Sequence, residues 1–443
     1  MIITEKMLTQ GKKHGEKILK YFNSLDYDHS WSFEEYTTKD TNYITHGYHR
    51  YPAKFIPQLA NRLIRELSNQ GDLVCDPFMG SGTALVEAKV LGRRSIGVDI
   101  NPVAVLIAEA KVTAIEPAKL QGYFDLISSK IKNAHPLFFV KEAVEPYIPQ
   151  NERIDYWFKP DTKIALGRIL SEINLISDKK VRTFFLCSFS HILKSCSIWL
   201  QRSTKPTRDF KKVIPDPYEA FLKHCRMILK KNNEYYTILE KDGFLAVECN
   251  PSKGDARKIP VDDGTVALVV TSPPYVTSYE YADLHQLTAL WLNYATNIRG
   301  FRKDFIGSSR NGRDNIILES KIAEDVVKQL EINKTGKASE VATYFHEMRE
   351  SFVEIHRYLK KSGKACIVIG DTTFKKVSVP NAEVFVEQME NIGFKIYKVI
   401  KRRIPSKILP QTRDPLTGKF TSSNNNTKTL AYPYEYIMIM EKV

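Results

Sequence analysis

Short apolar runs bounded by polar turns recur near the beginning of the chain and again through its C-terminal half. Runs of this length that are rich in Val and Ile predict buried strands. We expect seven strands, and the last two are close enough in sequence to form a hairpin. The expected strands lie at 73–75, 95–98, 244–249, 266–271, 365–369, 394–403 and 434–441.

Longer stretches, in which apolar positions recur every three or four residues, lie between these strands and predict helices. The alternation stops after the second strand, and residues 103–242 are mainly helical by pattern. This order of elements predicts an α/β fold with a doubly wound sheet and a helical insertion. The expected helices lie at 11–24, 57–67, 83–91, 103–112, 120–131, 161–175, 181–195, 218–240, 342–359 and 381–389, and one more follows Tyr275 and reaches Trp291.

The first two strands enclose a Gly-rich turn at 76–83 and a helix, and Asp99 follows the second strand. An acid in this place suits a ligand with ribose hydroxyl groups. A dinucleotide fits poorly, because Leu85 replaces the third glycine of G-x-G-x-x-G and Asp76 would repel a pyrophosphate. The chain also lacks the Gly-Lys-Ser/Thr of a P-loop. An adenosine that carries a positive group fits better, and the alternative is a structural tight turn.

A second turn, Thr271-Ser272-Pro273-Pro274-Tyr275, follows the apolar run at 266–270. Its two prolines lack N–H donors and have a fixed φ, so they end the strand and stiffen the loop. The loop presents carbonyl groups, the Ser272 hydroxyl and the Tyr275 ring at the sheet edge where α/β proteins bind ligands. A planar ring with an exocyclic amine suits it, since the amine can donate while Tyr275 stacks on the ring. The alternative is a Pro-rich turn after a core strand.

The chain of 443 residues has a formal net charge of +14, although its charged content of 26% is ordinary. This excess of Lys and Arg points to a polyanionic partner, with solubility alone as the alternative. Basic residues gather near 202–212, 299–313 and 395–419, where we expect phosphate contacts, with a merely solvated surface as the alternative. The residues expected to make these contacts are Arg202, Lys205, Arg208, Arg302, Arg310, Arg402 and Arg413.

The six cysteines are scattered, without C-x-x-C spacing or clustered histidines. We therefore expect neither a zinc site nor a disulfide framework, and a reducing cytoplasm fits best. The first residues do not read as a signal peptide, and no apolar run reaches membrane-spanning length, so we expect no membrane partner.

Together these motifs resemble the S-adenosylmethionine-dependent amino methyltransferases of DNA, which methylate cytosine N4 or adenine N6. The resemblance covers roughly residues 46–115 and 243–443. It implies a Rossmann-like methyltransferase sheet of seven strands, one of them antiparallel, which agrees with the pattern above. It also implies S-adenosyl-L-methionine as the cofactor and double-stranded DNA as the substrate. The helical block before Asp255 departs from the motif order of the family.

The resemblance also assigns roles to the motifs. Residues 52–55 look like the element that helps to hold the methionine end of the cofactor, Asp99 like the ribose acid, and Asp255 like the residue at the adenine. The implied cofactor-binding residues are Lys54, Phe55, Asp76, Phe78, Gly80, Gly82, Thr83, Asp99 and Asp255, and the implied catalytic residues are Ser272, Pro273, Pro274 and Tyr275.

These roles divide the chain into three parts. Residues 1–115 are expected to form the N-terminal part of the catalytic domain, with the cofactor motifs. Residues 116–242 form the helical insertion, a candidate DNA-recognition module, and residues 243–443 form the rest of the catalytic domain.

An exocyclic amine is a poor nucleophile, because its lone pair is delocalised into the ring. We expect the Ser272 hydroxyl and the Pro273 carbonyl to accept its hydrogens, so that a pyramidal nitrogen attacks the methyl group directly. The base must be flipped out of the duplex, and it would stack on Tyr275. Methylation at cytosine C5 would need a cysteine nucleophile, and no Cys follows a Pro.

The residue that opens the catalytic loop indicates which base is methylated. In the family, loops beginning Ser-Pro-Pro go mostly with cytosine N4, and those beginning Asp-Pro-Pro or Asn-Pro-Pro go mostly with adenine N6. Because Ser272 stands there, we expect site-specific methylation of cytosine N4, with adenine N6 as the alternative. An RNA base methyltransferase and a non-catalytic DNA-binding protein are further alternatives. A restriction endonuclease that acts on the same site is a candidate partner.

Overall fold

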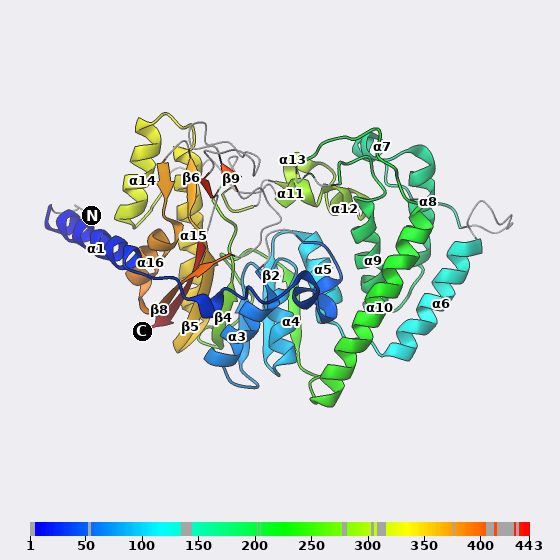
Figure 1. The fold of residues 1–443 in the computed structure, drawn as a ribbon, viewed down its shortest axis with the longest axis horizontal. Coiled ribbons are helices and arrows are strands. Elements are labelled where there is room, and N and C mark those ends of the chain that lie inside the picture. The colour runs from blue at the N-terminus through cyan, green and yellow to red at the C-terminus, as the bar shows by residue number, and fades with distance from the viewer. Residues whose placement is uncertain are drawn as a thin grey trace.

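The computed structural model describes residues 5–51, 55–133, 144–201, 203, 205–276, 281–302, 305–307, 316–374, 377–404, 412–413, 429–430 and 434–443. Its centre is a seven-stranded sheet with the strand order β3-β2-β1-β4-β5-β11-β8 (Figure 1). The strands are β1 (Leu73–Asp76), β2 (Arg94–Asp99), β3 (Cys249–Lys253), β4 (Val266–Thr271), β5 (Leu359–Ile369), β8 (Phe394–Arg403) and β11 (Tyr434–Lys442).

The strands from β3 to β5 in this order pair in parallel, whereas β11 pairs antiparallel with both β5 and β8. The expected doubly wound sheet with one antiparallel strand is therefore confirmed, and so is the hairpin of the last two strands. Because the parallel strands share one direction, the loops after β1, β2, β3 and β4 all leave the sheet at the same edge.

Successive side chains of a strand point to opposite faces of the sheet, and each face is covered by its own apolar core. Val269 and Ile367 point to the core beneath α1, α14, α15 and α16, and Leu268 and Val368 point to the core beneath α3 and α4. The helices around the sheet are α1 (Glu5–Asn23), α3 (Pro57–Leu67), α4 (Thr83–Val90), α5 (Pro102–Val112), α14 (Lys321–Ile332), α15 (Ala338–Tyr358) and α16 (Asn381–Ile392).

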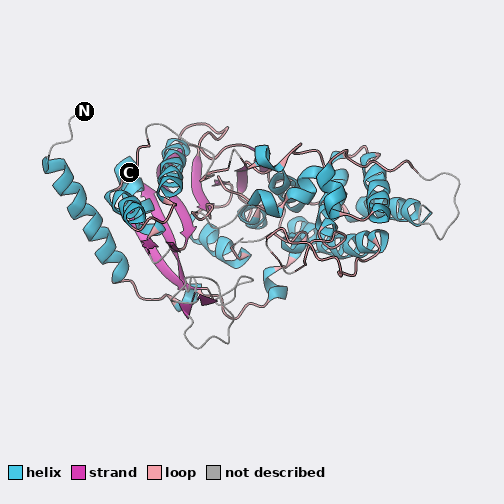
Figure 2. Cartoon of the chain, turned by 90° about the horizontal axis from the view of Figure 1, so that it is seen from above, coloured by secondary structure: helices cyan, strands magenta, loops and turns pink. Residues whose placement is uncertain are grey.

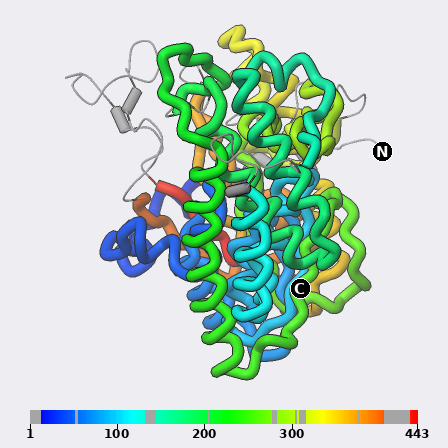
Figure 3. The backbone as a smooth tube through the Cα atoms, turned by 90° about the vertical axis from the view of Figure 1, so that its right-hand side faces the viewer, coloured from blue at the N-terminus to red at the C-terminus, as the bar shows by residue number. Residues whose placement is uncertain are grey.

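A block of helices lies to one side of the sheet, and Figure 2 shows the strands gathered at the other side. It contains α6 (Pro117–Asn133), α7 (Glu152–Trp157), α8 (Pro160–Asn174), α9 (Lys179–Leu193) and α10 (Pro217–Lys241). The long helix α10 contacts α6, α8 and α9 (Figure 3). These helices share one apolar core with α5 and α12, so the block is packed against the part of the fold that carries α5. The division of the chain at 115 and 242 stays a prediction.

The remaining elements are short. They are η1 (His29–Trp31), α2 (Thr38–Thr41), η2 (Ile44–Gly47), α11 (Tyr281–Leu284), α12 (Gln286–Trp291), α13 (Ile298–Phe301), β6 (Thr372–Phe374), β7 (Val377–Val379), β9 (Thr412–Arg413) and β10 (Thr429–Leu430). None of the helices in the described ranges is both long and apolar enough to cross a membrane. Likewise, the described part of the chain holds no group of three or more His, Cys, Asp or Glu side chains that could bind a metal ion.

The expected strand at 244–249 is wrong. Phe244 and Leu245 do pack against the apolar core, but they lie in the turn that ends α10, where the Phe244 N–H donates to the Leu239 carbonyl at 2.7 Å. The strand at this place is β3, five residues of mixed polarity that include Pro251. An edge strand pairs on one side alone and so tolerates a proline and polar residues.

The helix expected at 342–359 is present as α15, but the position expected to be its last residue is not helical. Helix α15 ends at Tyr358, and β5 begins at Leu359 without a connecting loop. Leu359 packs in the core as the first strand residue instead of the last helical one. Apolar periodicity alone could not distinguish these two states over so few residues.

Candidate active site

The turn between β1 and α4 contains glycines that let other atoms come close to its backbone. Gly80 and Gly82 have φ of +49° and +76°, in the left-handed region that favours glycine. A Cβ at Gly82 would lie 2.9 Å from the Cβ of Ala108, so the turn can pack against α5 only with glycine there. Phe78 lies in the same turn, and Thr83 begins α4.

Asp99, at the end of β2, holds this turn in place. Its Oδ2 accepts from the Gly80 N–H at 2.9 Å, and its Oδ1 accepts from the Asn101 N–H at 2.9 Å. Burial raises the pKa of Asp99 to about 6, although these two hydrogen bonds oppose the shift. The carboxyl group therefore lies at the carboxyl edge of the sheet, beside the Gly-rich turn, as the sequence predicts.

Asp76 faces inward, under the same turn. Its Oδ1 accepts from the Thr271 hydroxyl at 2.6 Å and from the Phe78 N–H at 3.1 Å. The side chain is buried, which raises its pKa to about 7. Since Asp76 ends β1 and Thr271 ends β4, this contact joins the start of the Gly-rich turn to the start of the Pro-rich loop.

The Pro-rich loop at 272–275 follows β4 directly. The Tyr344 hydroxyl on α15 donates to the Pro274 carbonyl at 2.7 Å. The Tyr275 hydroxyl donates to Oε2 of Glu435 at 3.2 Å, and the same end of the ring lies against Gly370. Ser272 is half-buried at the start of the loop. The structure thus brings the two sequence-predicted loops to one edge of the sheet.

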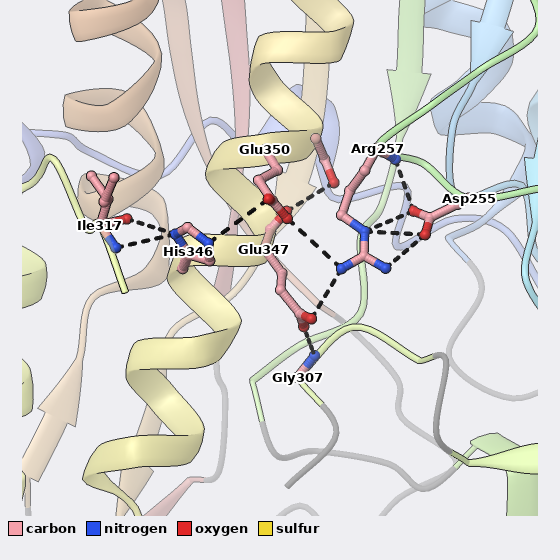
Figure 4. A network of polar contacts seen from close by, with 8 residues as sticks. Asp255, Arg257, Gly307, Ile317, His346, Glu347 and Glu350 are labelled. Atoms are coloured by element: carbon pink, nitrogen blue, oxygen red, sulfur yellow. Dashed lines mark hydrogen bonds and ion pairs between the residues drawn. The ribbon is translucent and has the colours of Figure 1, made fainter. Parts of the chain in front are cut away.

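Asp255 lies just past β3, at the same edge, and Figure 4 shows its surroundings. Arg257 donates to both of its carboxylate oxygens, from Nε to Oδ1 at 2.9 Å and from Nη2 to Oδ2 at 2.6 Å. The preceding Gly254 N–H donates to the Asp99 carbonyl at 3.1 Å, which ties this turn to the end of β2. Sequence reasoning missed Arg257, because a single Arg after an Asp is not a motif.

Of the expected element at 52–55, the structure describes Phe55 alone. Lys54 falls outside the described residues, and Phe55 is half-buried two residues before α3 begins. Tyr51 was not predicted: its ring lies against Gly80 and is tilted over His285, with ring centroids 4.9 Å apart. His285 in turn contacts the Asn101 amide through Nδ1 at 2.7 Å, and burial lowers its pKa to about 4. The position of Tyr51 directly before the expected element at 52–55 was the available signal.

The structure describes the side chains of four of the seven predicted phosphate contacts, Lys205, Arg208, Arg302 and Arg402. Lys205 is exposed, and Arg208 stacks between Tyr156 and Phe210, at 4.1 and 4.4 Å from the two ring centres. Arg302 forms an ion pair with Asp283. Arg202 and Arg310 lie outside the described residues, and for Arg413 only its place in β9 is described.

Arg402 differs from the expectation of a surface contact. Its side chain is 3% exposed, and its Nε lies 3.4 Å from Oε1 of Glu435. Strand residues alternate between the two faces of a sheet, and the position of Arg402 in β8 turns it inward.

The chain is similar in sequence to known DNA methyltransferases. Residues 4–110 and 266–443 match the family model of the N6/N4 DNA methylases, and the stretch between them contains the helical block and Asp255. The type II methyltransferase M.MvaI from Kocuria varians is 29% identical over 397 residues, which cover 85% of this chain and 87% of that protein. M.BsoBI from Geobacillus stearothermophilus is 24% identical over 424 residues, which cover 81% of this chain and 80% of that protein. Among solved structures, a TehB-like methyltransferase from Corynebacterium glutamicum aligns over 86% of both chains at 9% identity and a TM-score of 0.27.

Proposed function

Because the chain belongs to the N6/N4 DNA methylase family, we propose that it methylates the exocyclic N4 of cytosine at specific sites in duplex DNA. The chain is a DNA methyltransferase, and its cofactor is S-adenosyl-L-methionine. The choice of cytosine is supported by Ser272, which opens the catalytic loop. Adenine N6 is the second candidate, because the same loop chemistry serves either amine.

The residues at the ends of β1 and β2 fit the cofactor. The backbone at Gly80 and Gly82 can approach a ligand closely, since neither residue carries a Cβ. Asp99 lies where ribose hydroxyl groups can donate to its carboxylate. When bound, S-adenosylmethionine supplies an electrophilic methyl group on a positively charged sulfur.

The Pro-rich loop would prepare the amine for attack. The Ser272 hydroxyl and the Pro273 carbonyl accept the two amine hydrogens, which favours a pyramidal nitrogen with an available lone pair. The ring of Tyr275 stacks on the flipped base, and its fixed hydroxyl keeps that ring in place. Alignment of the amine then supplies most of the rate, and no covalent enzyme intermediate is needed.

The contact between Asp76 and Thr271 carries the proposal, because it holds the cofactor turn and the catalytic loop next to each other. Two loops of unrelated sequence that are joined at one edge of a sheet can bring a donor and an acceptor of the methyl group within reach of one another. A hydrogen bond at 2.6 Å between two buried groups fixes their spacing better than a surface contact would.

DNA recognition is proposed for the helical block and the basic segments. The loop after α9 exposes Lys205 and Phe210, a cation and an aromatic ring, which suit a phosphate and a base. Since the curated relatives are named type II methyltransferases, a restriction endonuclease that cuts the same site is the proposed partner.

Transfer of an isotope-labelled methyl group to duplex DNA tests the proposal. The product DNA is digested to nucleosides and analysed by mass spectrometry, with a matched RNA as a second substrate. Labelled N4-methylcytidine from RNA, or cofactor binding without any transfer, would indicate one of the alternative functions.

A further inference from the structure

Helix α15 contacts the loop at 272–275 and the Arg257–Asp255 pair through two side chains spaced three residues apart. Tyr344 donates to the Pro274 carbonyl of the catalytic loop at 2.7 Å. Glu347 accepts from Nη1 of Arg257 at 3.0 Å, and Arg257 in turn holds Asp255 (Figure 4). Residues spaced by three lie on the same face of a helix, so one face of α15 meets both partners.

Glu347 also holds a third segment. Its Oε2 accepts from the Gly307 N–H at 2.7 Å, and its side chain is 0% exposed. Gly307 has φ of +72°, and a Cβ there would lie 3.1 Å from the Tyr344 ring. Burying a carboxylate destabilises the fold unless the group is paired and hydrogen-bonded. The contacts with Arg257 and Gly307 therefore fix the position of Glu347.

Arg257 is well suited to connect two acids. Its planar fork binds Asp255 through Nε and Nη2, while Nη1 remains directed at Glu347, with Glu350 at 3.8 Å. A lysine carries the same charge but cannot form this two-sided contact. Any displacement of Asp255 therefore has to move Arg257, and with it the contact to α15.

We propose that Arg257, Glu347 and Tyr344 are positioning residues that couple the adenine contact at Asp255 to the catalytic loop at Pro274. The inference rests on the proposed function, which places the cofactor's adenine at Asp255 and the target base at 272–275. A cofactor held at Asp255 restrains Arg257 and α15, and through Tyr344 it restrains the catalytic loop. Less conformational freedom then remains to be lost when the target base enters.

This connection makes the binding of cofactor and DNA reciprocal. The dissociation constant of S-adenosylhomocysteine is measured by calorimetry, alone and with a duplex that the wild-type protein methylates. The wild-type protein should bind the analogue about fivefold more tightly, or better, when the duplex is present. Arg257→Lys should weaken binding of the analogue and bring the effect of DNA close to none.

Tyr344→Phe provides a second variant that removes one oxygen atom and so preserves the fold. It should lower kcat about 2–10-fold, the effect of one hydrogen bond, and weaken the effect of DNA on analogue binding. Its affinity for the analogue alone should stay unchanged. The matched control is Tyr358→Phe on the same helix, whose hydroxyl contacts the Cys75 thiol at 3.6 Å and not the catalytic loop.

The outcomes separate the inference from the proposed function. Wild-type coupling that persists in both Arg257→Lys and Tyr344→Phe would overturn the inference, and so would a wild-type protein in which DNA leaves analogue binding unchanged. A wild-type protein that transfers no methyl group to DNA would instead reject the proposed function. Loss of coupling in both variants, with normal behaviour of Tyr358→Phe, would establish the connection.

Discussion

The Thr271 hydroxyl donates a 2.6 Å hydrogen bond to the buried carboxyl group of Asp76, across the gap between two adjacent parallel strands. Asp76 begins the Gly-rich turn, and Thr271 precedes the Pro-rich loop. This contact joins the two loops directly, and it lies in an apolar setting where an unpaired polar group is energetically costly.

Thr271→Val removes this donor and keeps the shape of the side chain. We expect the free energy of unfolding to fall by about 1–3 kcal/mol, because the buried Asp76 loses a partner. Methyl transfer should slow as well, since the two loops are no longer tied. Thr265→Val is the control at the opposite end of β4, where the hydroxyl donates to an exposed carbonyl. Urea denaturation should show a clearly smaller loss for the control; equal losses would contradict this role of Thr271.

The ionisation of Asp76 should make stability depend on pH. Burial raises its pKa from 3.8 to about 7. Between these values the folded chain holds a proton that the unfolded chain releases, so the free energy of unfolding falls as pH rises through this window. The contribution is of the order of 4 kcal/mol, from three pKa units.

The side chain in Asp76→Asn cannot ionise. This variant should therefore lack the part of the pH dependence of the free energy of unfolding that comes from Asp76. Other acids with a raised pKa, such as Asp99 at about 6, still titrate, so the quantity to measure is the difference between variant and wild-type unfolding across the window. Parallel curves for the two proteins would show that Asp76 is already ionised in the fold.

Asp99→Ala should weaken S-adenosylmethionine binding by about 1.5–3 kcal/mol, the scale of a hydrogen bond to a charged group. The side chain also holds Gly80, so part of the loss would come from a loosened turn. Asp99→Asn separates the two effects, because its amide oxygen can still accept from one backbone N–H. Calorimetry measures the affinity of both variants for the cofactor. Unchanged affinity in Asp99→Ala would contradict the proposed contact between Asp99 and the ribose.

DNA affinity should depend strongly on salt. If the protein neutralises about 6–10 phosphates, affinity should fall by roughly 10³–10⁵ between 50 and 200 mM salt. Lys205→Gln should reduce the slope of log affinity against log salt by about 1. Arg402→Gln should leave that slope unchanged, because its side chain is buried. A flat titration of the wild-type protein would show that its basic segments are solvated surface.

The sequence allowed prediction of the parts of this fold that local chemistry determines. The turn at 76–83 and the loop at 272–275 are punctuated by Gly and Pro after apolar strands, so both could be placed at the sheet edge. Edge strand β3 could not be found, because its polar residues carry no apolar pattern. Helix α14 was overlooked although Ile322, Val326 and Leu330 do repeat at helical spacing.

The site residues that sequence reasoning missed depend on long-range contacts. Arg257 meets Glu347 across 90 positions, and His285 meets Asn101 across 184. No local pattern encodes such a pair, and their roles emerge only when the sheet brings the elements together. Arg402 was expected on the surface because of its charge. Its burial follows from the pairing of β8 in the sheet, which the local sequence does not show.

The central claim, that this chain methylates cytosine N4, is tested most directly by identifying the methylated nucleoside. Duplex DNA is incubated with labelled S-adenosylmethionine and either the wild-type protein or Ser272→Ala, then digested and analysed by mass spectrometry. We predict labelled N4-methyldeoxycytidine, formed about 10–100-fold more slowly by Ser272→Ala at unchanged cofactor affinity. Labelled N6-methyldeoxyadenosine in its place would contradict the assignment of the base, and full activity of Ser272→Ala would contradict the role of the hydroxyl.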